Sequence, residues 1–144
     1  MILVGTRVDT YLDSLGCTVG ESLLEPHINY TNHVFCALET NETIKGIAHI
    51  TGGGLTENIP RILPEGCSAS IRRGSWPSLP VFDTIKELGN IETEEMYRAF
   101  NMGIGMILIV DKESFNPIAN SLKNITPVYK TGEINKGDNI TSYV

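Results

Sequence analysis

Residues 49–64 read HITGGGLTENIPRILP, and this stretch decides the fold that we expect around it. The apolar run 46–50 that leads into it has the length and flanks of a buried strand. Three glycines follow, and residues 55–63 are compatible with a helix whose regular extension Pro60 limits. A strand, a glycine loop and a helix start in succession present unpaired backbone N–H groups, so the stretch predicts an anion-binding loop.

Polar side chains on and beside this loop are the candidate site residues. His49 ends the expected strand, and its imidazole can donate or accept a proton near neutral pH, so it is the candidate catalytic residue. A hydroxyl, an amide and a guanidinium accompany it, and these groups can orient a phosphorylated substrate. The expected substrate- and phosphate-binding residues are Thr51, Gly52, Gly53, Gly54, Asn58 and Arg61.

Each assignment has a structural alternative. The three glycines can form a tight turn that binds nothing, and His49 can be a structural residue at a strand end. The loop is not a P-loop, because no Gly-Lys-Ser or Gly-Lys-Thr follows it, and it lacks the dinucleotide-binding Gly-x-Gly-x-x-Gly pattern. Asn58 can cap the helix, and Arg61 can form a surface ion pair with Glu57 or Glu65.

Composition places the chain among ordinary globular proteins. Its 144 residues are one domain by length, and 41% of them are hydrophobic and 19% charged. The formal charge of −6 disfavours nucleic-acid binding, which usually needs a basic face. No apolar run approaches the roughly 20 residues that span a membrane, and residues 1–4 are too short for a signal-peptide core. We therefore expect a cytoplasmic protein without a nucleic-acid or membrane partner.

Cysteine and histidine spacing predicts no metal site. Cys17, Cys36 and Cys67 are odd in number and form no Cys-x-x-Cys pair, so free thiols in a reducing compartment are expected. His27 and His33 are six residues apart, which is not a helical ligand spacing, and we expect both on the surface. The chain also shows no acidic pair suited to magnesium.

Apolar periodicity predicts helices that alternate with strands along the chain. The expected helices are 26–38, 79–88, 93–100 and 113–122, besides a short helix or turn at 10–15. The expected strands are 46–50, 67–72, 104–110 and 128–134, and a polar tail follows Asn135. The run 104–110 is the most apolar segment and is typical of a central strand. This alternation predicts an α/β layered domain, and the strand order stays open.

Two further expectations concern packing. The helix 26–38 is expected to carry one apolar face at helical spacing, formed by Leu24, Ile28, Val34, Phe35 and Leu38. Trp76 lies in an expected loop, and we interpret it as a packing residue and not as a platform for stacking a base.

Three segments of the chain resemble one known family. They are residues 45–64, the stretch Gly74-Ser75-Trp76-Pro77, and residues 94–106, which read EEMYRAFNMGIGM. Together they resemble the C-terminal domain of phosphoribosylformylglycinamidine cyclo-ligase, also called AIR synthetase. Separated motifs at family-like spacing are far more specific than a lone run of glycines.

The resemblance covers most of the chain. It is close over 44–110 and looser over 16–38 and 113–133, so the domain is expected at 16–144 and residues 1–15 stay unassigned. It implies a mixed β-sheet packed with helices. It also implies that the turn at Asn101 helps to shape the site.

The resemblance implies a reaction in de novo purine biosynthesis. In this family, ATP activates the formamide oxygen of formylglycinamidine ribonucleotide, an internal nitrogen attacks, and the ring closes to aminoimidazole ribonucleotide. ATP and Mg²⁺ are the implied cofactors, and a phosphoribosyl compound is the implied substrate. The family holds the nucleotide mainly on a separate N-terminal domain, which also forms the dimer. We therefore expect a substrate-side C-terminal domain that lacks this ATP-binding domain or homodimer partner and is inactive alone.

The resemblance fails at one position. Where the family usually has Pro-Thr and then a basic residue before Ile-Tyr, this chain has His27 and Ile28 after Pro26. If the basic residue binds substrate phosphate, Ile28 cannot replace it. A noncatalytic remnant or an anion-binding interaction module with the same fold is therefore the alternative. A third reading is another ATP-dependent member of the superfamily, acting on selenide, thiamine phosphate or a carbamoyl group.

Overall fold

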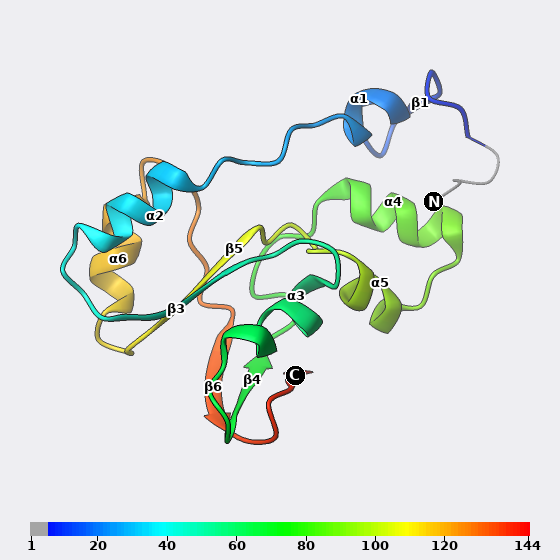
Figure 1. Cartoon of the computed structure of the whole chain (residues 1–144). Coiled ribbons are helices and arrows are strands. Elements are labelled where there is room, and N and C mark those ends of the chain that lie inside the picture. Colours follow the sequence, from blue (N-terminus) through cyan, green and yellow to red (C-terminus); the bar gives the residue numbers. More distant parts are fainter. Residues whose placement is uncertain (1–5) are drawn as a thin grey trace.

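Helices alternate with strands over residues 6–144, the part of the chain that the computed structural model describes (Figure 1). The helices are α1 (Val19–Leu23), α2 (Thr31–Leu38), α3 (Gly54–Asn58), the 3-10 helix η1 (Pro60–Ile62), α4 (Pro80–Gly89), α5 (Thr93–Ala99) and α6 (Phe115–Leu122). The strands are β1 (Tyr11–Leu12), β2 (Cys17–Thr18), β3 (Ile44–His49), β4 (Cys67–Ile71), β5 (Met106–Val110), β6 (Gly132–Lys136) and β7 (Thr141–Tyr143). The α/β class predicted from the alternation is confirmed.

The strands pair in three small sheets. β3 and β5 are antiparallel, with Ile47 opposite Leu108 and His49 opposite Met106. β4 lies between β6, which is antiparallel to it, and β7, which is parallel to it. β1 and β2 form a third, two-stranded sheet. The mixed sheet implied by the family resemblance is therefore the β6-β4-β7 sheet.

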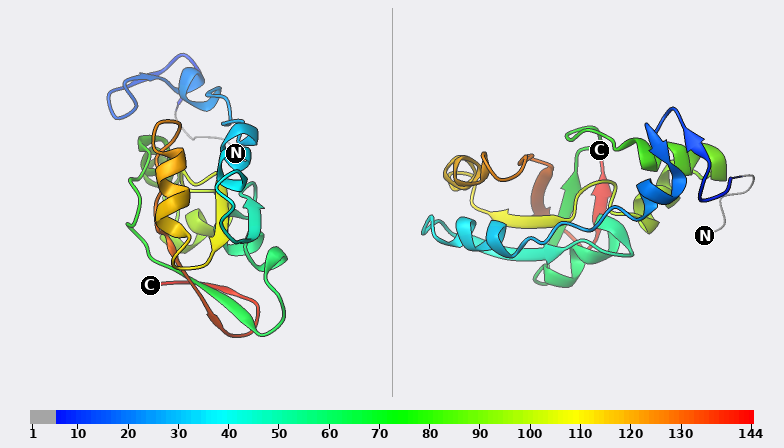
Figure 2. Two further views of the ribbon diagram at one scale, coloured as in Figure 1. Left: turned by 90° about the vertical axis from the view of Figure 1, so that its left-hand side faces the viewer. Right: turned by 90° about the horizontal axis from the view of Figure 1, so that it is seen from above.

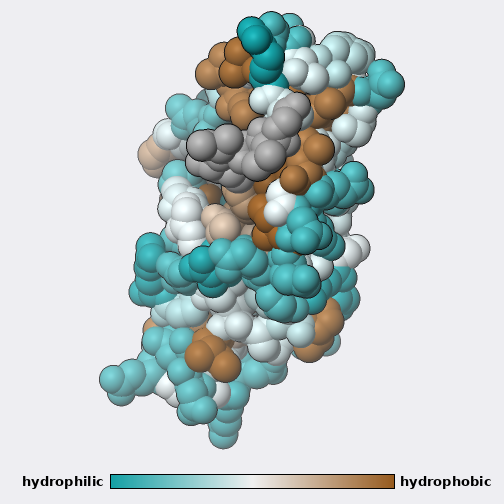
Figure 3. All heavy atoms as spheres, turned by 90° about the vertical axis from the view of Figure 1, so that its right-hand side faces the viewer, coloured by the Kyte–Doolittle hydropathy of each residue, from teal (hydrophilic) through white to brown (hydrophobic). Residues whose placement is uncertain are grey.

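The β3–β5 pair runs between two helical ends of the molecule. At one end α2 and α6 pack side by side, as two perpendicular views show (Figure 2). At the other end α1 lies near α4, and Ser14 Oγ is 3.1 Å from Thr84 Oγ1. Figure 3 shows that apolar side chains gather over this second end. The exposed ones include Val8, Tyr11, Leu23, Leu24 and Leu88.

The main hydrophobic core lies beneath α3 and the glycine loop. Ile50, Leu55 and Ile59 are each at most 1% exposed and form its centre. Trp76 joins this core, and its indole Nε1 donates a hydrogen bond of 2.8 Å to the carbonyl of Met102. The packing role predicted for Trp76 is confirmed.

A second, smaller core joins α2 to α6 and contains Ala37, Ile118 and Leu122. β5 lies between the two cores. Its residues Ile107 and Ile109 pack against the main core, whereas Leu108 and Val110 pack against the second. Both faces of β5 are therefore covered by apolar side chains.

The prediction of a helix over 26–38 is wrong in its first half, because α2 begins only at Thr31. The side-chain Oδ1 of Asn29 accepts a hydrogen bond of 3.0 Å from the Thr31 N–H, which is a local turn that competes with a helix. The predicted apolar face is not buried as a unit. Leu24 is 82% exposed and Phe35 60%, whereas Ala37 is fully buried.

The end of the chain also differs from the prediction. The strand expected at 128–134 begins at Gly132 and continues to Lys136, and the polar tail contains β7. The connection between β6 and β7 passes around the start of β4, where the Gly137 N–H donates to the Gly66 carbonyl at 3.0 Å. The expected short helix or turn at 10–15 contains β1 followed by a turn.

The run 104–110 forms a strand but not a central one. β5 pairs with β3, and within residues 6–144 no strand pairs with its other edge. All five of its residues are only half-buried, although they are the most apolar run of the chain.

The remaining element predictions are confirmed within about two residues. They concern β3, β4, α4, α5 and α6, and also the break after α3, where Pro60 starts η1. Cys17, Cys36 and Cys67 are free, as expected. Among residues 6–144, no helix is both long and apolar enough to cross a membrane.

The core position of Ile50 yields a stability prediction. Ile50→Ala removes a fully buried side chain beneath the glycine loop, so the free energy of unfolding should fall by about 2–5 kcal/mol. Urea unfolding followed by circular dichroism measures this change. Val8→Ala is the control, because Val8 is 73% exposed and should change stability by less than about 0.5 kcal/mol. Equal effects of both changes would contradict this core.

Candidate functional site

His49, the candidate catalytic residue, lies exposed at the end of β3 and contacts a second histidine. Its Nε2 is 2.8 Å from Nε2 of His27, and the two ring centroids are 4.9 Å apart. A hydrogen bond between two ring nitrogens requires one to donate and the other to accept. One hydrogen atom therefore lies between the two Nε2 atoms, and the tautomers of the two rings set which of them donates it.

Tyr30 supports this histidine pair from the far side of His27. The two rings meet edge to face, with centroids 5.7 Å apart. The Tyr30 hydroxyl rests on Gly105, where a Cβ atom would lie 2.4 Å from the hydroxyl oxygen. Burial raises the pKa of Tyr30, and the hydrogen bond from the Gly105 backbone opposes this shift. Tyr30 therefore stays neutral near pH 7, and its ring packs against His27 as a structural support.

The three glycines of the loop have three different roles. Gly54 has a φ of +55°, and a Cβ there would lie 2.4 Å from the carbonyl oxygens of both Tyr97 and Phe100. Gly53 has a φ of +93°, and a Cβ there would meet the flexible Glu57 side chain. At Gly52 a Cβ would have no neighbour within 4 Å. Gly54 is therefore required by packing, whereas Gly52 faces open space.

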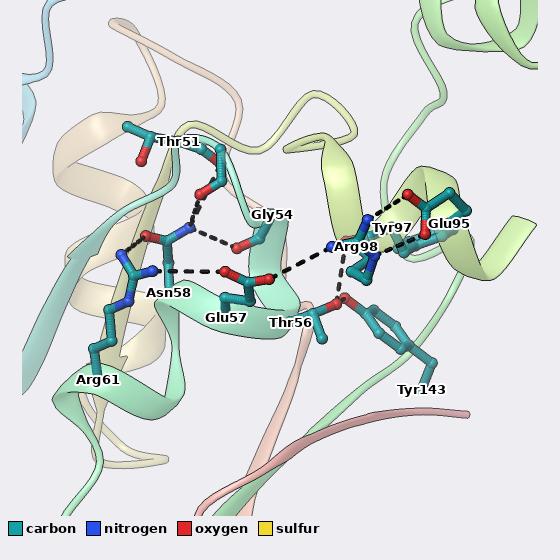
Figure 4. Close-up of polar contacts among 11 residues, drawn as sticks. Thr51, Gly54, Thr56, Glu57, Asn58, Arg61, Glu95, Tyr97, Arg98 and Tyr143 are labelled. Carbon is teal, nitrogen blue, oxygen red and sulfur yellow. Dashed lines mark hydrogen bonds and ion pairs between the residues drawn. The ribbon is translucent and has the colours of Figure 1, made fainter.

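Asn58 ties the loop together from inside (Figure 4). The side chain is 6% exposed, and its Nδ2 donates to the carbonyls of Gly54 at 2.8 Å, Gly52 at 3.2 Å and Thr51 at 3.5 Å. Its Oδ1 accepts a hydrogen bond of 3.1 Å from Nη1 of Arg61. The structure thus uses Asn58 to fix the loop conformation.

Two arginines and two glutamates surround the start of α3 (Figure 4). Arg61 Nη2 lies 3.6 Å from Glu57 Oε2, and Arg98 Nη1 lies 3.8 Å from Glu57 Oε1. Arg98 also donates two hydrogen bonds to Glu95, and these lower the pKa of the Glu95 carboxyl. The ion pair of Arg61 with Glu57 that the sequence left open is therefore present. An incoming anion must compete with Glu57 for both guanidinium groups.

Asn101 lies in the turn between α5 and β5. Its Oδ1 accepts a hydrogen bond of 3.0 Å from the Gly103 N–H, and Met102 within the turn has a φ of +51°. Within residues 6–144, no hydrogen bond joins Asn101 to His49 or to the glycine loop. Its neighbour Phe100 provides one of the carbonyls packed against Gly54.

The structure brings some predicted residues together and adds others. Asn58 joins the backbones of the loop to Arg61, and Thr51 exposes its side chain at the loop start. Sequence reasoning missed His27, whose distance of 22 positions from His49 carries no spacing signal. It also missed Arg98, which comes from α5. His33 was expected on the surface, but it is half-buried and its Nδ1 has no partner within residues 6–144.

The chain does not supply the ligands for a metal ion in the part that the structure describes. Among residues 6–144, no group of three or more His, Cys, Asp or Glu side chains is placed to hold one. Mg²⁺ is usually held by carboxylates together with substrate phosphates. The donor set of residues 6–144 therefore does not fit a Mg²⁺ site, and the resemblance implies that the family holds this ion mainly on a separate N-terminal domain.

A strand end carrying a histidine, a glycine loop packed on α5 and a mixed sheet define an α/β domain with one candidate substrate site. The family described as "AIR synthase related protein, C-terminal domain" matches this chain over residues 3–144. The chain belongs to this family.

The curated relatives are enzymes named phosphoribosylformylglycinamidine cyclo-ligase. The relative from Brevibacillus brevis is 44% identical over 140 residues, which cover 96% of this chain and 40% of the relative. The relative from Acetivibrio thermocellus is 49% identical over 121 residues, covering 83% of this chain and 35% of the relative. The relative from Bacillus subtilis is 42% identical over 135 residues. The chain thus spans about two fifths of the length of the relatives it matches.

The glycine loop yields a prediction that separates packing from binding. Gly54→Ala should lower the free energy of unfolding by at least about 2 kcal/mol, because the new Cβ meets two backbone carbonyls at a positive φ. Gly52→Ala should change it by less than about 1 kcal/mol. Urea unfolding of both variants measures this difference. Equal losses would contradict the loop geometry.

The histidine pair yields a spectroscopic prediction. His27→Ala removes the hydrogen bond to His49 Nε2, so the ¹⁵N signals of the His49 ring should change in their tautomer pattern. Long-range ¹H–¹⁵N correlation spectra of the 144-residue chain near neutral pH measure this. The control is Lys123→Ala, an exposed change beside α6 that should leave the His49 signals in place. Unchanged signals in His27→Ala would show that the pair does not form.

Proposed function

We propose that this chain is the substrate-side part of an ATP-dependent cyclo-ligase that converts formylglycinamidine ribonucleotide to aminoimidazole ribonucleotide in purine biosynthesis. The observation that carries the proposal is the position of His49, which ends β3 directly before a glycine loop, in a chain that matches the family over residues 3–144. The names of the relatives supply the substrate class. The expected location is the cytoplasm.

In this proposal the exposed side of the loop holds the substrate. The backbone of Gly52 and Gly53 and the hydroxyl of Thr51 contact its phosphate. Thr51 and Gly52 are exposed, whereas at Gly53 the phosphate would take the place of the Glu57 side chain. Arg61 and Arg98 supply positive charge when the anion displaces Glu57. Asn58 acts by holding the loop carbonyls, and Asn101 by shaping the turn next to α5.

The histidine pair handles the proton that ring closure releases. In ring closure the attacking nitrogen would form a bond to the formamide carbon and lose a proton, and the bond from that carbon to the activated oxygen would break, so that the oxygen leaves in phosphate. The donating ring of the His27–His49 pair can take up this proton on its Nδ1, which carries no hydrogen in a neutral ring that donates through Nε2. Uptake of the proton is the role of His49, because His49 lies next to the loop. His27 holds the His49 ring in place.

The nucleotide site is assigned to polypeptide that this chain does not match. ATP supplies the activation of the formamide oxygen in the family. Residues 6–144 do not fit a Mg²⁺ site, so ATP and the metal are held elsewhere in this proposal. A companion domain that holds ATP, or a dimer partner that completes the site, is therefore part of the proposal. The chain alone is expected to be inactive.

A noncatalytic anion-binding module is the second candidate, and one residue favours it. Ile28 stands where the family resemblance expects a basic residue, and its side chain is 52% exposed. An apolar side chain cannot bind phosphate there. The two candidates differ in turnover once the companion domain is supplied.

The proposal is tested by supplying the part of a relative that this chain does not match. We define the companion polypeptide as the part of the Brevibacillus brevis enzyme that this chain does not match. A complex of the two should form aminoimidazole ribonucleotide from formylglycinamidine ribonucleotide and ATP, measured by product absorbance after derivatisation. Complex formation without turnover would contradict the cyclo-ligase function and favour the noncatalytic module.

Replacement of His49 yields a prediction for the same complex. In that complex, His49→Ala should lower kcat by about 10²–10⁴-fold, because a positioned proton-transfer group is lost. Its melting temperature should stay close to that of the unaltered complex, because His49 is exposed. Lys123→Ala, far from the loop in the sequence and exposed on the surface, is the control and should retain full kcat. An unchanged rate in His49→Ala would remove His49 from the mechanism.

A further inference from the structure

β5 has the sequence and the surroundings of a central strand but an open edge. Its residues MILIV form a continuous apolar run, which is typical of strands covered on both faces. Both faces are covered here, by Ile50 and Leu55 of the main core on one side and by Ile118 and Leu122 of the second core on the other. Only β3 pairs with it within residues 6–144. An apolar strand with a free edge is a site where another strand can pair.

The hydrogen-bond pattern shows which backbone groups point to this edge. Ile50 and Gly105 continue the β3–β5 register, and the Ile50 N–H donates to the Gly105 carbonyl at 2.9 Å. Opposite residues in an antiparallel pair alternate between bonded and non-bonded pairs. Ile107 therefore bonds to β3, whereas the N–H and C=O groups of Met106 and Leu108 point away from it.

A groove runs along this free edge. It is a cavity of about 350 Å³ whose lining is mostly apolar. Its walls come from α2 and its N-cap, from α6 and from the connection before β6. They include Tyr30, Val34, Ile118, Leu122, Val128 and Tyr129. The groove therefore combines unpaired backbone groups on one side with apolar side chains on the others.

We propose that this groove takes up one additional β-strand, which pairs with the free edge of β5. Its occupant is an extended segment with apolar side chains, contributed by the polypeptide that makes up the rest of the relatives' length. Main-chain hydrogen bonds to Met106 and Leu108 would hold its backbone, and the groove walls would take its side chains. β5 would then be a central strand, as its sequence predicts.

The length of the relatives and the shape of the groove select this occupant. The chain covers about 40% of the relatives, so polypeptide that could supply the strand exists in them. A second copy of this chain is disfavoured, because its own β5 is enclosed by its own α2 and α6, which would meet the same helices here. The inference does not rest on the cyclo-ligase reaction and holds equally for a noncatalytic module.

Residue-resolved amide exchange tests the proposal. In the 144-residue chain alone, the Met106 and Leu108 amides should exchange at least about tenfold faster than that of Ile107. The companion polypeptide should slow exchange at Met106 and Leu108 by at least about tenfold and leave Ile107 nearly unchanged. Measurement at two chain concentrations separates pairing between copies.

Three results would overturn the proposal. In the first, the companion polypeptide does not bind at saturating concentration. In the second, it binds and leaves the Met106 and Leu108 amides unprotected. The third result is protection of these amides in the 144-residue chain alone. If that protection rises with chain concentration, a second copy occupies the groove.

A proline variant gives an independent test. Met106→Pro removes an N–H that β3 does not use, so the chain should still fold, but binding of the companion polypeptide should weaken at least about tenfold. Met106→Leu keeps the N–H and similar volume, and should bind within about twofold of the unaltered chain. Equal binding by both variants would contradict pairing at this edge. If Met106→Pro does not fold, the amide-exchange measurement on the unaltered chain tests the pairing in its place.

Discussion

The antiparallel pairing of β3 with β5 is the constraint on which the rest of the structure depends. It fixes which residues at and just after the end of β3 point inward, so that Ala48 and Ile50 are buried in the main core while His49 is exposed on the opposite face. The glycine loop begins where this pairing ends. A slip of one residue would bury His49 and expose Ile50, because side chains alternate along a strand. The position of the candidate catalytic group is thus a direct result of strand register.

Buried contacts fix the conformation of the glycine loop, whereas its other side is exposed. Gly54 allows the carbonyls at the end of α5 to pack against it, and the amide of Asn58 binds three loop carbonyls. The anion-binding and the structural interpretations of the glycines are therefore not exclusive, since Gly54 serves packing whereas a Cβ at Gly52 would meet open space. The ion pairs of Glu57 with Arg61 and Arg98 hold both guanidinium groups on this exposed side.

Sequence reasoning found those features that depend on local pattern. The strand before the loop, the break at Pro60 and the helix α4 follow from periodicity and from proline geometry. Sequence reasoning failed where a polar contact, either local or between distant residues, determines where an element begins or which residues meet. The Asn29 turn delays the start of α2, and the polar segment β7 forms a strand because it pairs with β4. The His27–His49 contact joins residues with no shared spacing, and only the fold reveals it.

The most direct test of the account is calorimetric titration of the 144-residue chain with ribose 5-phosphate, and separately with ATP and Mg²⁺. A preformed substrate site predicts that the sugar phosphate binds without ATP and that Arg61→Ala weakens this binding, whereas ATP–Mg²⁺ shows no binding of its own. Binding of ATP–Mg²⁺ but not of the sugar phosphate would contradict the assignment of this domain to the substrate side. Absence of binding by either ligand would contradict a preformed site and leave the glycine loop as a structural turn.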